Sequence, residues 1–249
     1  MAIAIKTPQE IEKMRASGRI LRQVHQAVEA AVKPGASTMD LERVAEAKIK
    51  ELGGKPAFKG YNDYPACLCT SVNNEVIHGI PSEKKVLQDG DIVSVDCGVI
   101  LDGYYSDAAV THGVGSISPE KRKLLDVTKA SLAQAIKEAQ VGSTLGDIGA
   151  AVQELCEAEG FGVVRDFVGH GIGKSMHEDP QVPNYGRRGK GTRLKAGMVL
   201  AIEPMINAGG ADVKVLKDGW TAVTVDGSVS AHFEHTVAIT KDGPMILTQ

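Results

Sequence analysis

The sequence predicts an α+β fold in which two related α/β halves share a central antiparallel sheet. Three observations predict it: the order helix, helix, strands occurs twice, two pairs of segments repeat at one offset, and the first half contains a β-hairpin signal. The chain has 249 residues, and the halves cover about 1–115 and 116–249. No linker rich in Pro, Gly or Ser separates them, so we expect residues 1–249 to form a single domain.

Each half should begin with an amphipathic helix. The motif TPQE at residues 7–10 supplies a threonine N-cap, a proline at the first helical position and a glutamate for a capping box. Apolar residues then recur with a helical period until residues 34–35, Pro-Gly, where the helix should end. The motif SPE at residues 118–120 begins a similar helix, which should end near Gly142.

The two halves repeat beyond these helices. The segment GASTMDL resembles GSTLGDI, and in a second pair Leu, Gly, an apolar strand and a final acid recur in the same order. The paired segments, each separated by 107 residues, are 35–41 with 142–148 and 87–96 with 194–203. Two matches at one offset indicate an internal duplication. The repeat gives Asp96 and Glu203 equivalent positions, so both carboxylates can face one cleft between the halves.

A hairpin in the first half contains two unexpected acids. Residues 92–100 alternate between apolar and other side chains, and Asp102-Gly103 is a strong signal for a two-residue turn. Pairing about that turn sets Asp96 opposite Ala109, so Asp107 becomes a diagonal neighbour on the same face as Asp96. Two carboxylates there repel each other, and burying them is costly unless a cation lies between them.

The second half adds two more acids and several histidines in apolar surroundings. Glu203 ends the run VLAIEP and Glu234 interrupts the run AHFEHTVAI. His170 and His78 are flanked by glycines, where backbone can approach closely, and His177 follows seven residues after His170. The four acids carry a charge that two divalent cations would neutralise. Oxygen ligands with one imidazole suit Mn, Fe, Co or Zn, and a two-metal site of this kind is typical of a hydrolase.

Composition excludes several other classes. The formal net charge of −3 offers no electrostatic reason to bind nucleic acid or anionic membranes. No apolar run is long enough to span a membrane, and the N-terminus lacks the apolar core of a signal peptide. The four cysteines form no CxxC pair or disulfide framework, which favours reduced thiols in a cytoplasmic protein.

These residues and motifs resemble the type I methionine aminopeptidases. The supporting motifs are VNNEVIHGIP around His78, GHGIGKSMHEDP around His170 and His177, and AIEPM around Glu203. The resemblance covers nearly the whole chain. It implies the pita-bread fold, known from creatinase and the aminopeptidases, in which two halves are related by a pseudo-twofold axis. It also implies that residues 1–249 form one catalytic domain.

The resemblance assigns five residues to two divalent ions. Asp96 would chelate one ion, Asp107 and Glu234 would bridge both, and His170 and Glu203 would complete the other. The ions implied are two per chain, chosen among Co, Mn, Fe and Zn.

The resemblance also implies a mechanism. A metal-bridging water or hydroxide would attack the scissile carbonyl, with Glu203 as general base and acid. His78 and His177 would contact the substrate amide and stabilise the tetrahedral intermediate. The free α-amine would sit on the ion bound by Asp96, which would restrict cleavage to N-terminal residues.

The implied substrate is the N-terminal methionine of a nascent polypeptide whose second residue is small. Positions that match the family's methionine pocket are Tyr61, Tyr64, Cys69 and Trp220. Met176 stands where relatives often carry phenylalanine, and Phe58 replaces a cysteine found in some relatives. Both replacements are apolar, so they affect the pocket's shape and leave its character unchanged.

Two other functions stay open at this point. One is a peptidase of the same superfamily acting on Xaa-Pro peptides, although such enzymes usually carry a large extra N-terminal domain. The other is a non-catalytic peptide-binding module, although such relatives typically lose metal ligands. A monomer is expected, and contact with the ribosome is an open question.

Several polar residues receive no functional role. His25 lies on a helix and is expected to be exposed, while His112 and His232 lie near strands. The segment GRRGKG at residues 186–191 is expected to be a solvated loop, because no strand–loop–helix context surrounds it.

Overall fold

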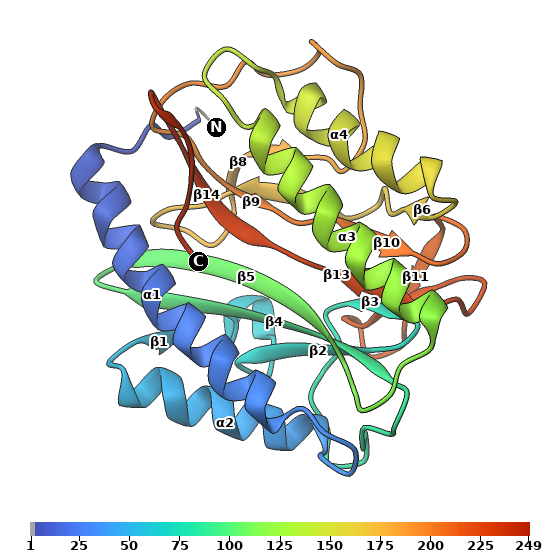
Figure 1. Ribbon diagram of the computed structural model, residues 1–249. Coiled ribbons are helices and arrows are strands. Elements are labelled where there is room, and N and C mark those ends of the chain that lie inside the picture. Colours follow the sequence, from blue (N-terminus) through green and yellow to red (C-terminus); the bar gives the residue numbers. More distant parts are fainter. Residues whose placement is uncertain (1–2) are drawn as a thin grey trace.

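Two pairs of helices lie on the outside of an antiparallel set of strands, as the sequence predicts (Figure 1). The computed structural model describes residues 3–249. The helices are α1 (Pro8–Ala31) and α2 (Thr38–Glu51) in the first half, and α3 (Pro119–Glu138) and α4 (Leu145–Ala158) in the second. Over the described range, none of the helices has the length and apolarity needed to cross a membrane.

Two larger sheets form the centre of the molecule. The first contains β1 (Lys55–Pro56), β4 (Ile92–Leu101), β2 (Leu68–Val72) and β5 (Tyr104–Gly113), with β5 paired to β4. The second has the order β15 (Gly243–Ile246), β14 (His235–Thr240), β9 (Val199–Ile202), β7 (Gly169–Gly171) and β8 (Glu178–Val182).

Two smaller sheets and one short helix complete the fold. One small sheet has the order β13 (Ser230–His232), β10 (Met205–Asn207) and β6 (Gly162–Val163). The other has the order β11 (Val213–Val215), β12 (Ala222–Thr224) and β3 (Glu75–Ile77), and a 3-10 helix, η1, covers Tyr61–Asp63.

The predicted helix starts are confirmed. The side chain of Thr7 accepts a hydrogen bond from the backbone N–H of Glu10, and the Glu10 carboxylate accepts one from Thr7 in return. The first helix ends at Ala31, slightly before the predicted Pro34-Gly35. Pro34 disfavours helical backbone at the residue before it, so the chain leaves the helix early.

The repeat is visible in the backbone as well as in the sequence. Helices α2 and α4 begin and end at positions 107 residues apart. Isolated bridges join Ser37 to Val86 and, at the same offset, Thr144 to Arg193. The internal duplication therefore describes two copies of one structural unit.

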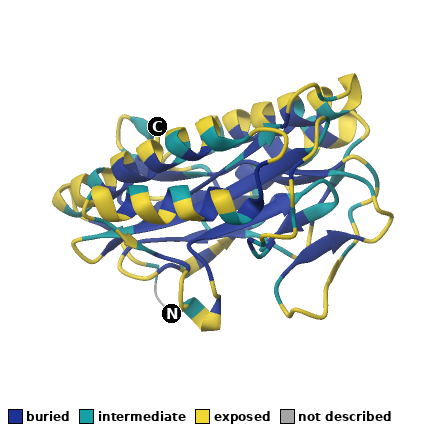
Figure 2. Cartoon of the chain, turned by 90° about the horizontal axis from the view of Figure 1, so that it is seen from below, coloured by how far each residue is buried: buried dark blue, intermediate teal, exposed yellow. Residues whose placement is uncertain are grey.

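Each half has its own apolar core, and both helices and strands contribute side chains to it. Figure 2 shows strands that are mostly buried beneath helices whose outer faces are exposed. Behind the hairpin, Val93, Val95, Cys97 and Val99 pack against α1 and α2. Cys97 is fully buried there. The apolar face of β4 is thus anchored, which leaves its other face free to present Asp96.

Candidate metal centre and substrate pocket

The hairpin has the predicted register. Asp96 pairs with Ala109 and Asp107 pairs with Gly98 across β4 and β5. Asp102 and Gly103 form the turn with φ angles of 49° and 78°, which is the left-handed geometry of a two-residue hairpin. The two aspartates therefore lie on one face, as the alternation predicted.

The second half brings its acids to the same place through hydrogen bonds between the sheets. The hydroxyl of Thr236 on β14 accepts from the backbone N–H of Asp107 at 2.9 Å and donates to its carbonyl oxygen at 2.8 Å. Just before β14, the backbone N–H of Glu234 donates to the carbonyl oxygen of Ala109 at 2.9 Å. Glu203 follows β9, where Asn184 donates to its carbonyl oxygen at 2.9 Å.

The ring of His170 reaches two of these carboxylates. Its Nε2 lies 3.8 Å from Asp107 Oδ2 and 3.6 Å from Glu203 Oε1. Its Nδ1 is 2.9 Å from the carbonyl oxygen of Gly171, which accepts the Nδ1 proton and leaves the Nε2 lone pair facing the acids. The ring therefore has the orientation that a metal-binding imidazole needs.

The atoms of this cluster fit divalent cations. The ligand atoms of Asp107, His170 and Glu234 lie within 4.8 Å of one another. One oxygen each of Asp96, Asp107 and Glu234 is buried without a hydrogen-bond partner. Buried polar atoms are normally paired, so these oxygens have the environment expected of metal ligands.

Electrostatics lead to the same conclusion. Burial, opposed by the nearby His232, raises the pKa of Asp96 to about 7. Burial also raises the pKa of Glu203 to about 8. Burial and repulsion from neighbouring acids hold the pKa values of Asp107 and Glu234 well above their usual range. The four carboxylates resist ionising together, and divalent cations would remove that repulsion.

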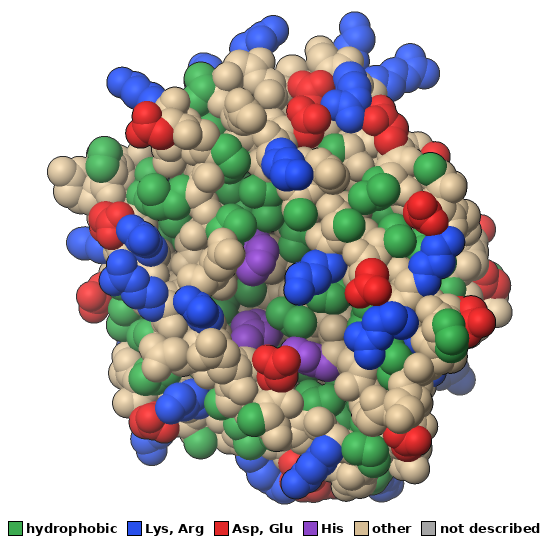
Figure 3. Space-filling model, viewed as in Figure 1, with side chains coloured by type: hydrophobic (Ala, Val, Ile, Leu, Met, Phe, Trp, Pro, Cys, Tyr) green, Lys and Arg blue, Asp and Glu red, His purple; other side chains and the backbone are tan. Residues whose placement is uncertain are grey.

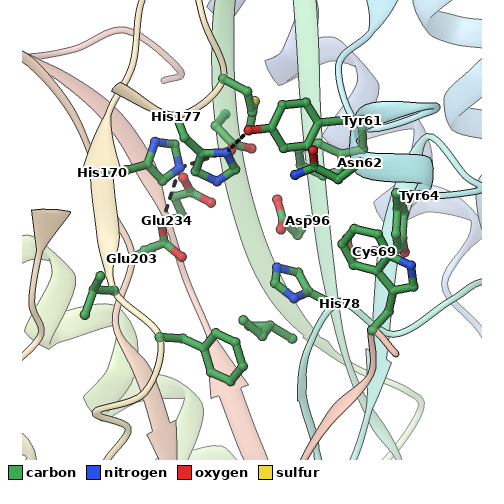
Figure 4. Close-up of a pocket in the computed structure, with 17 residues that line it drawn as sticks. Tyr61, Asn62, Tyr64, Cys69, His78, Asp96, His170, His177, Glu203 and Glu234 are labelled. Carbon is green, nitrogen blue, oxygen red and sulfur yellow. Dashed lines mark hydrogen bonds and ion pairs between the residues drawn. The ribbon is translucent and has the colours of Figure 1, made fainter. Parts of the chain in front are cut away.

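A cavity of about 260 Å³ opens beside the acids (Figure 4). Among its walls are all six side chains that the sequence assigned to the methionine pocket or its variable positions: Phe58, Tyr61, Tyr64, Cys69, Met176 and Trp220. The ring of Tyr64 meets Trp220 edge-on at 5.0 Å, and Met176 is buried in the same apolar cluster. This wall can hold an unbranched apolar side chain.

Two histidines face each other across the cavity, as Figure 4 shows. His78 has a left-handed backbone with a φ of 59° and packs edge-on against Phe167 and Trp220. The Nδ1 of His177 lies 2.8 Å from the hydroxyl of Tyr61. Burial lowers the pKa of His78 to about 4 and also lowers that of His177, so both rings are neutral near pH 7.

The sequence interpretation missed some lining residues. Asn62, Ile77, Phe167 and Val168 also line the cavity. They lie in η1, at the end of β3 and in the loop before β7, where no periodic pattern indicates the direction in which a side chain points. His232, which received no role, places its Nε2 3.6 Å from Glu203 Oε2. Strand alternation in the run around Glu234 was the available signal, because residues two apart share a face.

A second cavity corrects one expectation. Histidines gather in a hollow between α1 and α3 (Figure 3), and His25, His112 and His235 line a cavity there. His25 was expected to be exposed, but it is half-buried and its Nε2 donates to the carbonyl oxygen of Ala108 at 2.9 Å. The prediction was wrong because α1 packs across β5, and this packing covers the ring of His25. The loop at residues 186–191 is exposed, as expected.

Comparisons with known proteins agree with this geometry. The model of metallopeptidase family M24 matches residues 12–241. A methionine aminopeptidase of Clostridium acetobutylicum is 55% identical over 246 residues, which cover 99% of this chain and 98% of that one. The crystal structure of a methionine aminopeptidase from Thermotoga maritima is 50% identical, with a TM-score of 0.98 and full coverage of both chains.

A more distant structure shares only the fold. The prolidase of Pyrococcus horikoshii is 24% identical with a TM-score of 0.80, and the match covers 98% of this chain but 63% of the prolidase. The matches above, which are at least 50% identical and cover at least 98% of each chain, separate this chain from that branch. The chain belongs to metallopeptidase family M24 and, within it, to the type I methionine aminopeptidases.

Proposed function

We propose that this protein removes the N-terminal methionine from nascent polypeptides whose second residue is small. The observation that carries the proposal is the position of four acids and a histidine at one side of a cavity with an apolar opposite wall. Such a cavity accepts a short N-terminal residue and brings its peptide bond to the acids. The Xaa-Pro alternative is not favoured, because the relatives that match along their full length are methionine aminopeptidases.

We further propose that the five residues Asp96, Asp107, His170, Glu203 and Glu234 hold two divalent cations. The unpaired buried oxygens and the raised pKa values support this assignment. Mixed oxygen and imidazole ligands suit Mn, Fe, Co or Zn. When bound, such ions supply Lewis-acid polarisation and lower the pKa of water.

The protein's own groups would perform the remaining steps. Glu203, which directly follows β9 and lines the cavity, would accept the proton of the attacking water and return it to the leaving amine. His177 and His78 would donate hydrogen bonds to the scissile peptide group of the substrate from either side of the cavity. The hydroxyl of Tyr61 is hydrogen-bonded to His177 Nδ1 and so fixes the orientation of that ring.

The proposal extends to the domain organisation, the oligomeric state and the location of the protein. Residues 1–249 would act as a single catalytic domain, as a monomer in the cytoplasm. The apolar wall formed by Tyr61, Tyr64, Cys69 and Trp220 would select the methionine side chain.

A peptide assay tests the function. The metal-reconstituted protein is incubated with Met-Ala-Ser, Met-Lys-Ser and Ala-Pro-Ser, and free amino acids are measured. We expect methionine release from the first peptide only, its loss in Asp96→Ala, and normal activity in the control Asp126→Ala, which changes an exposed acid on α3. Cleavage of the Ala-Pro peptide instead would favour the Xaa-Pro alternative. No cleavage with Mn, Co and Fe each supplied would favour a binding module.

A further inference from the structure

His232, at the end of β13, has an unexplained environment beside the metal cluster. Its side chain is 2% exposed, and its Nε2 has no hydrogen-bond partner among the described residues. A buried nitrogen without a partner is uncommon in proteins and calls for a ligand or a function.

His232 lies as close to the carboxylate of Glu203 as His170 does. The Nε2 of His170 lies 3.6 Å from one carboxylate oxygen of Glu203, and the Nε2 of His232 lies 3.6 Å from the other. An N–H···O hydrogen bond is about 2.7–3.2 Å long, so this separation is too wide for one. Two ligands held tetrahedrally about 2.1 Å from one ion lie roughly 3.4 Å apart, which is close to the observed separation.

The carboxylate of Glu234 connects two groups of ligand atoms. One group is Asp107, His170 and Glu234, and the other is Glu203, His232 and Glu234. Within each group the atoms lie within 4.8 Å of one another. Because both groups contain Glu234, His232 belongs to the same cluster of ligand atoms as His170.

We propose that His232 Nε2 is a sixth protein ligand of the metal site, bound to the ion that Glu203 also holds. This inference rests on the proposed function, because it requires the ions of that site. A second imidazole shifts the donor set of this ion toward nitrogen, which favours Fe, Co or Zn over Mn. His232 would also leave this ion one open position fewer for water and substrate.

X-ray absorption of the Co²⁺-loaded protein tests the proposal without measuring activity. Imidazole scattering around cobalt should persist in His170→Ala and disappear in the double variant His170→Ala/His232→Gln. The control is His112→Gln, since His112 also has a buried Nε2 without a partner but lines the cavity between α1 and α3. This control should leave the scattering and the Co²⁺ affinity unchanged.

Two outcomes would overturn the proposal: loss of all imidazole scattering in His170→Ala alone, or unchanged scattering amplitude in His232→Gln. If the double variant does not fold, the two single variants still decide the question. Circular dichroism of each metal-free variant verifies folding. The peptide assay is separate, so a protein with two bound imidazoles and no methionine release would refute the function and support the ligand.

Discussion

In the protein without divalent cations, the free energy of unfolding should fall as the pH rises from about 5 to about 8. In the metal-free cluster, burial raises the pKa of Asp96 from 3.8 to about 7 and that of Glu203 from 4.5 to about 8. The unfolded chain releases these protons near pH 4. Between the two ranges the folded state binds more protons than the unfolded state, so the free energy of unfolding falls with rising pH.

The size of the effect follows from the retained protons. Each proton that the folded state holds in excess lowers the free energy of unfolding by about 1.4 kcal/mol per pH unit. Asp96 alone, protonated until its pKa of about 7, would account for roughly 3 kcal/mol between pH 5 and pH 7. Glu203 extends the decline toward pH 8. Against a total stability of about 5–15 kcal/mol, this loss is readily measured.

Urea denaturation followed by circular dichroism measures the effect. The chelated protein is unfolded at several pH values, with and without added Mn²⁺, and the ions should stabilise it more at pH 8 than at pH 5. Asp96→Asn, which cannot ionise, should have a shallower pH dependence in the chelated state. If the metal-free protein becomes more stable between pH 5 and pH 8, or if its stability does not change, the pKa values of these buried carboxylates are not raised and the reasoning is refuted.

Three further predictions concern other parts of the molecule. In Glu42→Ala, the buried N–H groups of residues 67–68 lose the carboxylate that accepts them at 2.7 and 2.9 Å, and urea denaturation should show a loss of about 2–4 kcal/mol. An unchanged midpoint would contradict this. In Gly18→Ala, the new methyl group would collide with the carbonyl oxygen of Leu247, which should lower stability by about 1–3 kcal/mol; a melting temperature equal to the parent's would disprove the close packing. Trp220→Ala opens the apolar wall, so KM for Met-Ala-Ser should rise about tenfold or more, consistent with the loss of about 1.5–3 kcal/mol from a buried apolar side chain, while kcat changes less. A fall in kcat alone would argue against a role in binding the side chain.

Much of the site could be predicted because its signals are local or repeated. The register of Asp96 and Asp107 follows from strand alternation and the turn at Asp102. The repeat places Glu203 opposite Asp96 in the other half. These patterns concern neighbours along the chain or a fixed offset, so a sequence displays them directly.

Other residues of the site gave no such signal. Asn62, Phe167 and Val168 reach the cavity from η1 and a loop, whose direction depends on the elements around them. His232 is only two residues from Glu234, but its distance to Glu203 depends on how β13 and the end of β9 approach each other.

The sequence by itself determined the class of this protein: two repeated α/β units, a hairpin with both aspartates on one face, and a matching acid from the second unit. These features depend on periodicity, capping and turn chemistry, which act over a few residues. The tertiary structure alone decided which groups meet. It joined β5 to β14 through Thr236, covered His25 beneath α1, and set two imidazoles at equal distances from Glu203. Such contacts join residues far apart in the chain, and only the packing of the two halves fixes them.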